Sequence, residues 1–220
     1  TAGILAALGT TFGVLLHLDF RLAIVLSATM TVAYTVRGGL WSIVWSPQSA
    51  PQNPATEFHY TQDVVGVPEF AGPKLGAGSN LVQIEADLQP GSAGVLYALG
   101  AFSGGLALWV EDGKLAYEYN LFEIERTRIE ARDALPTGKA TIEVETHIAT
   151  PRGAAAVTIR VNGKEVATGT VPRTAALAFT ANDAFDVGTD SYSPVSAAYF
   201  DRAPFAFNGR IGRLDIRYLH

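Results

Sequence analysis

Three aspartates lie close together between residues 182 and 190, in the run NDAFDVGTD. Carboxylate oxygens at short spacing around a glycine are the ligand type that Ca²⁺ prefers in proteins. The order of an EF-hand loop is not matched, and aspartates in turns more often accept hydrogen bonds from nearby backbone amides. We therefore favour a structural loop over a metal site for the three residues concerned, Asp183, Asp186 and Asp190.

A second group of residues that could carry a function is aromatic. It comprises Trp109, Tyr117, Tyr119 and Phe122. Side chains two residues apart on a strand point the same way, so Tyr117 and Tyr119 share one face, and Glu118 is expected in solvent on the other. An exposed aromatic face would stack on sugar rings as in a lectin, whereas a buried one would be ordinary core packing. We favour core packing because aromatic side chains dominate cores.

No catalytic machinery is evident in the rest of the chain. The chain has no cysteine, which excludes thiolate metal sites and cysteine nucleophiles. His59, His147 and His220 are far apart and do not show a ligand spacing. The net charge is −5 without a dense basic patch, which argues against a nucleic-acid partner.

Beyond residue 56 the hydrophobic pattern has the period of two that marks β-strands. Two hairpin signals interrupt it, Asp112-Gly113 and Asn162-Gly163, because both residue types tolerate positive φ. The charge-dense stretch Glu123–Arg132 fits either a helix surface or a polar strand, and we treat it as a solvated sheet edge. The predicted strands are Leu81–Leu88, Val95–Phe102, Leu106–Val110, Leu115–Asn120, Ala140–Ile148, Val157–Val161, Glu165–Val171 and Ile211–Tyr218.

The first 45 residues have a different character, with Asp19, Arg21 and Arg37 as their charged residues. Leu22–Trp45 is long enough to span a bilayer, which takes about 20 residues. Trp41 and Trp45 would then lie in an interfacial aromatic belt. The alternative is that these are buried helices of a soluble protein. A run rich in Pro, Gln and Asn, SPQSAPQNPAT, separates this segment from the strands.

The pattern LSATMTVAYTVRGGLWSIVW resembles a transmembrane stretch of the sodium:solute symporter family. In that family a helix ending in a tyrosine-threonine pair runs into a Gly-Gly-Leu-Trp turn. The resemblance cannot imply transport, because a helix pair lacks the second bundle that forms a midplane ion site. The matching residues are Tyr34, Thr35, Gly38, Gly39, Leu40 and Trp41.

The order of motifs in the remainder resembles the carboxy-terminal domain of bacterial arylsulfatases. The motifs are GGLALWVEDGKLAYEYN, LPTGKATIEVE, VNGKEVATGTV, FDVGTDSYSPVS and FNGRIGRLDIRY. The resemblance implies a concanavalin- or laminin-G-like sandwich that follows a catalytic core. It does not imply catalysis here, because the C/S-x-P-x-R motif that yields formylglycine is missing. Formylglycine and the divalent metal belong to that core, so no cofactor is expected in this chain.

These observations predict a mainly β protein, an antiparallel β-sandwich or jelly roll preceded by one or two hydrophobic helices. Residues 1–46 form the helical segment, 47–56 a linker and 57–220 the sandwich. The predicted function is a non-catalytic accessory domain of an arylsulfatase-like hydrolase, with a sulfatase core in trans and a membrane as possible partners. The alternatives are a membrane-tethered, lectin-like carbohydrate-binding sandwich and a symporter fragment.

Overall fold

The computed structural model describes residues 19, 21–23, 25–26, 29, 53–179 and 183–219. The chain divides into two compact units, Thr1–Ala50 and Pro51–His220. The boundary between them falls within the predicted linker. Each unit is considered by itself.

In the first unit, the described residues between 21 and 29 are helical. Asp19 caps this helix, because its Oδ1 accepts a hydrogen bond of 2.9 Å from the backbone N–H of Arg21. Among the residues described, no helix is long and apolar enough to cross a bilayer. Most of the predicted span Leu22–Trp45 lies outside them, and so do the residues Tyr34–Trp41 that carry the symporter resemblance.

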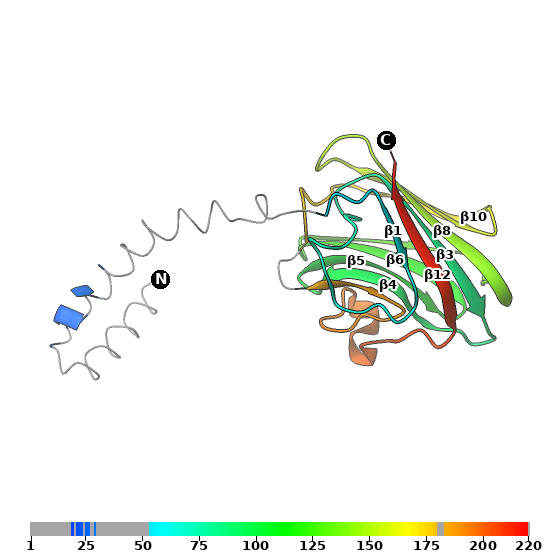
Figure 1. Ribbon diagram of the computed structural model, residues 1–220, viewed down its shortest axis with the longest axis horizontal. Helices are drawn as coiled ribbons and strands as arrows, with labels where there is room; N and C mark the ends of the chain where they lie inside the picture. The colour runs from blue at the N-terminus through cyan, green and yellow to red at the C-terminus, as the bar shows by residue number, and fades with distance from the viewer. Residues whose placement is uncertain are drawn as a thin grey trace. The chain divides into compact units, whose positions relative to one another are not determined.

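The second unit is the predicted antiparallel sandwich, built from two sheets that face each other (Figure 1). Within residues 53–179 and 183–219, sheet A has the order β1-β12-β3-β8-β9-β10 and sheet B the order β2-β11-β4-β5-β6-β7. The strands of sheet A are β1 (Glu57–Tyr60), β3 (Asn80–Leu88), β8 (Gly138–Ile148), β9 (Ala155–Val161), β10 (Lys164–Val171) and β12 (Arg210–Tyr218). Those of sheet B are β2 (Val67–Pro68), β4 (Gly94–Ala101), β5 (Gly104–Glu111), β6 (Lys114–Leu121), β7 (Glu125–Glu130) and β11 (Ala184–Val187).

The two sheets differ in how their outer faces are treated. Strand β3 of sheet A alternates between buried and less buried residues along its whole length, and β8 does so over its central part, so one face packs in the core and the other meets solvent. Strands β4 and β5 of sheet B are buried at almost every position. The reason is a covering segment, residues 188–207, which includes the short 3₁₀ helix η2 (Ala197–Arg202) and lies against the outer face of sheet B (Figure 1).

Both predicted hairpin turns are confirmed. Asp112 and Gly113 have φ of 50° and 73°, and Asn162 and Gly163 have φ of 51° and 78°. Each pair therefore supplies the two positive φ angles of a type I′ turn, whose twist matches that of the strands. The stretch Glu123–Arg132 contains the edge strand β7, as the solvated-edge interpretation expected.

The sequence analysis missed the strands β1, β2 and β11. β1 has four residues and β2 only two, too few to display a period. β11 is buried at all four positions, so the run AFDV shows no alternation. It lies inside the stretch that was interpreted as an aspartate loop.

Trp109, Tyr117 and Tyr119 lie in two hydrophobic cores. The alternative interpretation, in which they form an exposed face that stacks on sugar rings, is therefore wrong. Tyr117 and Tyr119 are each 1% exposed and point between the sheets. Trp109 is fully buried on the opposite face, against Tyr199 of the covering segment at 5.2 Å between ring centroids. Phe122 alone of the four is exposed. Glu118, expected in solvent, is buried as well, since the covering segment lies over it.

Tyr119 contributes a polar anchor to the core. Its hydroxyl donates to the carbonyl of Gly76 at 2.6 Å and accepts from the N–H of Ala175 at 2.7 Å. Burial is the main reason that the pKa of Tyr119 is raised well above its usual value. The ring thus joins sheet B to two loops.

We predict that Tyr119→Phe lowers the free energy of unfolding by about 1–3 kcal/mol, because it leaves a buried carbonyl and a buried N–H without their partner. Urea denaturation measures the effect. Tyr192→Phe, at an exposed tyrosine, is the matched control and should change stability by less than about 0.5 kcal/mol. Equal stability of both variants would contradict the prediction.

Candidate functional site

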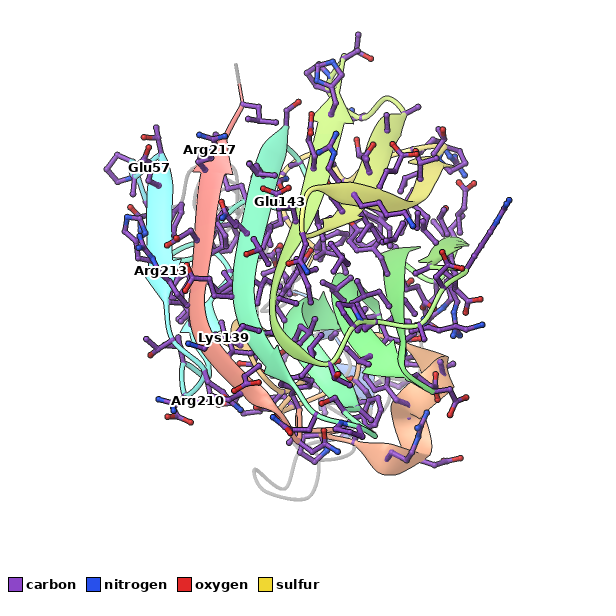
Figure 2. All side chains as sticks on the ribbon, turned by 90° about the vertical axis from the view of Figure 1, so that its right-hand side faces the viewer. Glu57, Lys139, Glu143, Arg210, Arg213 and Arg217 are labelled. Atoms are coloured by element: carbon purple, nitrogen blue, oxygen red, sulfur yellow. The ribbon has the colours of Figure 1, made fainter. Side chains whose placement is uncertain are left out.

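The outer face of sheet A is the open face of the sandwich, and it carries charged side chains from β1, β12, β3 and β8 (Figure 2). Figure 2 labels six of them, from three of these strands, on the face turned to the viewer. Side chains at alternate positions of each strand project from this face, so residues far apart in the sequence become neighbours. The labelled residues are Glu57, Lys139, Glu143, Arg210, Arg213 and Arg217.

A groove of about 480 Å³ lies on this face, over the ends of β3, β8 and β12 and the turn between β9 and β10. We call it the sheet A groove. In one row of the sheet, Arg210 lies opposite Asp87, and Asp87 lies opposite Lys139. In the next row, Glu85 lies opposite Thr141. The lining residues are Glu85, Ala86, Asp87, Lys139, Ala140, Thr141, Asn162, Arg210 and Gly212.

Most polar groups in the groove are not satisfied by one another. Among the described residues, Glu85, Lys139 and Arg210 have no oppositely charged group within 4.0 Å. Asp87 accepts a hydrogen bond of 3.2 Å from Nε2 of Gln89, and its second carboxylate oxygen is open. The groove therefore offers both donors and acceptors to a ligand.

Asn162 and Gly212 shape the groove. Oδ1 of Asn162 accepts from the N–H of Thr141 at 2.9 Å, which leaves its amide nitrogen as a donor. Gly212 lies at a β-bulge in β12, where two residues oppose one on β3. A Cβ at Gly212 would meet only the carbonyl oxygen of Glu85, at 3.7 Å, so the space above it is open.

A smaller hollow of about 210 Å³ lies on the same face, near the other end of β12. Its charges are already paired, since Oδ1 of Asp215 lies 2.6 Å from Nδ1 of His59 and 2.7 Å from Nε of Arg213. Partial burial raises the pKa of Asp215, but the hydrogen bonds from His59 and Arg213 outweigh this and hold the pKa below its usual value. This hollow therefore has fewer free groups for a ligand than the sheet A groove.

The three aspartates considered for a metal bind backbone amides instead. Asp186 accepts from the N–H groups of Gly66 and Ser191, at 2.7 and 2.8 Å. Asp190 accepts from the N–H of Val195 at 2.8 Å and from the hydroxyl of Tyr199 at 2.6 Å. Asp183 accepts from the N–H of Ala184. The structure thus supports the loop role, and no group of three candidate metal ligands occurs within the described residues.

The sequence analysis did not single out any residue of the groove as functional, and it named Asn162 only as part of a hairpin turn. The signal was present, because Glu85 and Asp87 occupy the polar positions of LVQIEADL and Lys139 and Thr141 those of KATIE. Arg210, however, is more than 100 residues from Asp87, and only the pairing of β12 with β3 brings them together.

Comparison with known proteins gives the fold but no family. No family model matches the chain. A short amino-terminal stretch distantly resembles the high-affinity choline transporter 1 of Drosophila melanogaster, with 44% identity over 45 residues. That match covers 20% of this chain and 7% of the transporter, so the chain spans only a small part of the curated relative it matches.

Three solved structures show a similar sandwich. Domains LG4-5 of the mouse laminin α1 chain match with a TM-score of 0.45 and 19% identity, over 76% of this chain and 42% of that one. Galectin LEC-6 of Caenorhabditis elegans matches with a TM-score of 0.42 and 10% identity, over 74% and 96%. Domain 4 of the Geobacillus stearothermophilus arabinanase AbnA, solved with arabinotriose, matches with 0.44 and 17%, over 74% and 76%. These likenesses concern architecture alone. None of the proteins named here is a sulfatase, and the arylsulfatase relationship stays a prediction.

Asp190 makes the stability of the covering segment depend on pH, because its hydrogen bonds join parts of that segment. Burial raises the pKa of Asp190 to about 7, and the nearby Asp186 and Asp183 add to this, although hydrogen bonds from Tyr199 and Val195 act in the opposite direction. The folded state therefore holds the Asp190 proton more tightly than the unfolded chain, where the pKa is about 3.9. This contribution to stability is full below about pH 4 and is lost as the pH rises through about 7.

We predict that from pH 4 to pH 8 the wild type loses about 2–4 kcal/mol of unfolding free energy relative to Asp190→Asn, because Asp190 ionises over this range and the asparagine of the variant does not. Urea denaturation at a series of pH values measures the difference. Asp63→Asn, at an exposed aspartate, is the matched control. A difference for Asp190→Asn that stays constant with pH would contradict the prediction.

Proposed function

We propose that the sandwich is a non-catalytic, lectin-like domain that binds a neutral saccharide in the sheet A groove. The observation that carries the proposal is the open groove of about 480 Å³, lined by hydrogen-bonding side chains that are not satisfied by one another. On the opposite sheet, residues 188–207 cover much of the outer face. A hollow of about 230 Å³ remains over β5, β6 and β7, but its Arg128 is already paired with Glu111 and Glu130.

The chemistry of the lining favours hydroxyl groups. Ionised Glu85 and Asp87 only accept hydrogen bonds, whereas Lys139, Arg210 and the amide nitrogen of Asn162 only donate them. A sugar hydroxyl both donates and accepts, so a ligand with several hydroxyls satisfies both sets at once. Such a ligand also avoids leaving any of these groups without a partner, which would cost binding free energy.

The charges of the groove favour a ligand without net charge. Two cations, Lys139 and Arg210, stand beside two carboxylates, Glu85 and Asp87, so the lining is neutral as a whole. The net charge of the chain is −5, which further disfavours a polyanionic saccharide at long range.

The carboxylates support binding rather than hydrolysis. Glu85 and Asp87 are two apart on β3 and face the same way, about 7 Å apart along the strand. A glycosidase with such a pair needs a general acid whose pKa is raised by an apolar environment. Glu85 is exposed, and the groove around it is lined mainly by polar and charged side chains rather than by an apolar wall.

We predict that the full chain binds neutral oligosaccharides on a glycan array. Glu85→Ala should lower the affinity for the glycan that binds best by about tenfold or more, as measured by titration calorimetry, because the substitution removes a charged hydrogen-bond acceptor. Gly212→Phe should abolish binding by placing a ring in the groove, since this position has no positive φ and an added Cβ there meets only the carbonyl oxygen of Glu85, at 3.7 Å. Thr170→Phe, which adds the same ring to the exposed face of β10, is the matched control and should bind normally.

Three outcomes would contradict the proposal. One is a glycan array with no hits. The second is unchanged affinity in Gly212→Phe when the variant melts cooperatively. The third is a set of hits confined to sulfated or uronate-bearing glycans, because it would exclude the neutral ligand that the balanced charges favour.

The resemblance to arylsulfatases adds one expectation about catalysis. The chain alone should not hydrolyse an aryl sulfate ester above the buffer rate, because the formylglycine motif is missing. In that case the groove would serve as an accessory site beside a core supplied by another chain. Hydrolysis by the purified chain would overturn the non-catalytic interpretation.

A further inference from the structure

Large apolar side chains are exposed at one end of sheet B, away from the sheet A groove. Phe122 and Ile124, in the turn between β6 and β7, are 40% and 74% exposed, and Phe200 of η2 is 51% exposed. Phe102, in the turn between β4 and β5, lies 5.3 Å from Phe200 between ring centroids. We call these four residues the aromatic end. Exposed apolar residues that gather in one region mark interaction sites more often than scattered ones do.

The turn that carries Phe122 is strained. Phe122 and Glu123 have φ of 54° and 59°, the left-handed values of a type I′ turn. The other two such turns of the sandwich use Asp-Gly and Asn-Gly, which adopt these angles readily. A phenylalanine there costs conformational free energy and persists only where the surroundings hold it. Strain of this kind is concentrated at functional sites.

A buried polar network holds the segments of the aromatic end together. Asn120 is fully buried; its Oδ1 accepts from the N–H of Glu123 at 2.9 Å and its Nδ2 donates to the carbonyl of Phe102 at 2.7 Å. Arg126 donates to the carbonyls of Phe102 and Val195, at 3.1 and 2.9 Å. The two turns and the segment leading to η2 are therefore fixed before any partner arrives, which lowers the entropic cost of binding.

The charges around the aromatic end are acidic. Each exposed phenylalanine is followed by an exposed carboxylate, Glu123 or Asp201, for which the described residues supply no ion pair. The nearby arginines are each paired with a carboxylate. The pairs are Arg126 with Glu118, Arg173 with Glu125 and Arg202 with Glu111.

We propose that the aromatic end is a docking surface for a protein partner whose contact region has an apolar centre and a rim of lysine or arginine. Two exposed carboxylates beside exposed apolar side chains complement such a partner in both respects. They disfavour a second copy of this chain, whose own carboxylates would meet them, and an anionic membrane surface. The proposal is independent of saccharide binding.

The test uses the full chain and a fluorescein-labelled amphipathic helical peptide of about 18 residues, five turns, with leucine on one face and arginine on the other. A matched peptide carries glutamate in place of arginine. We expect saturable binding of the basic peptide, at least about tenfold weaker binding of the acidic one, and slower amide exchange at residues 121–125 and in η2.

Two double variants separate the apolar and the charged contributions. The variant Ile124→Ser with Phe200→Ser removes the most exposed apolar side chains of the aromatic end. The variant Glu123→Lys with Asp201→Lys reverses the charge of its two exposed carboxylates. Each should lower the affinity for the basic peptide by about tenfold or more. Glu57→Lys with Glu165→Lys makes the same change of net charge on sheet A and should retain binding. Saccharide binding should be unchanged in the first two.

The proposal is overturned if the basic peptide does not bind, or if the sheet A control loses affinity as much as the rim reversal does, because the attraction is then nonspecific. Phosphatidylcholine–phosphatidylserine vesicles provide a further arm. If the chain binds these vesicles and the Ile124→Ser, Phe200→Ser variant does not, the aromatic end is a lipid-binding surface, and the proposal of a protein partner is overturned.

Discussion

The attachment of residues 188–207 to the outer face of sheet B is the interaction on which the rest of the structure depends. Asp190 ties the segment to itself through Val195 and Tyr199, and Tyr199 packs edge-on against Trp109. Ser196 donates to Glu118 at 2.9 Å, and Arg126 donates to the second oxygen of the same carboxylate at 2.8 Å. Removing one partner from a buried charge pair of this kind is strongly destabilising, because the other charge stays buried.

This attachment makes the two sheets unequal. With both faces covered, the strands β4, β5 and β6 of sheet B are buried almost throughout. Glu118 and Asn120 are tolerated there because no buried side-chain polar atom among the described residues lacks a partner. Sheet A keeps one face in solvent and can place charged residues there at every second position. The candidate groove is thus a consequence of which sheet the chain covers with its own later residues.

The same network links the core to the aromatic end. Asn120 and Arg126 both donate hydrogen bonds to the carbonyl of Phe102, in the turn between β4 and β5. Asn120 also accepts a hydrogen bond from the N–H of Glu123, which has a left-handed backbone conformation. A saccharide-sized groove and an apolar, acid-rimmed end therefore sit on one rigid sandwich, on different sheets. A domain with two separate surfaces can hold a ligand and a partner at the same time.

The sequence by itself determined the strands whose residues alternate and the turns whose residues tolerate positive φ. β3, β8, β9 and β12 follow from alternation, and the Asp112-Gly113 and Asn162-Gly163 turns from backbone preference, because these signals are local. Only the tertiary structure decided which faces are open. The burial of Glu118, which the strand pattern placed in solvent, follows only from the covering segment, and Arg210 meets Asp87 only through a pairing across more than 100 residues. Burial and register are set by long-range contacts, and a local pattern does not encode its distant partner.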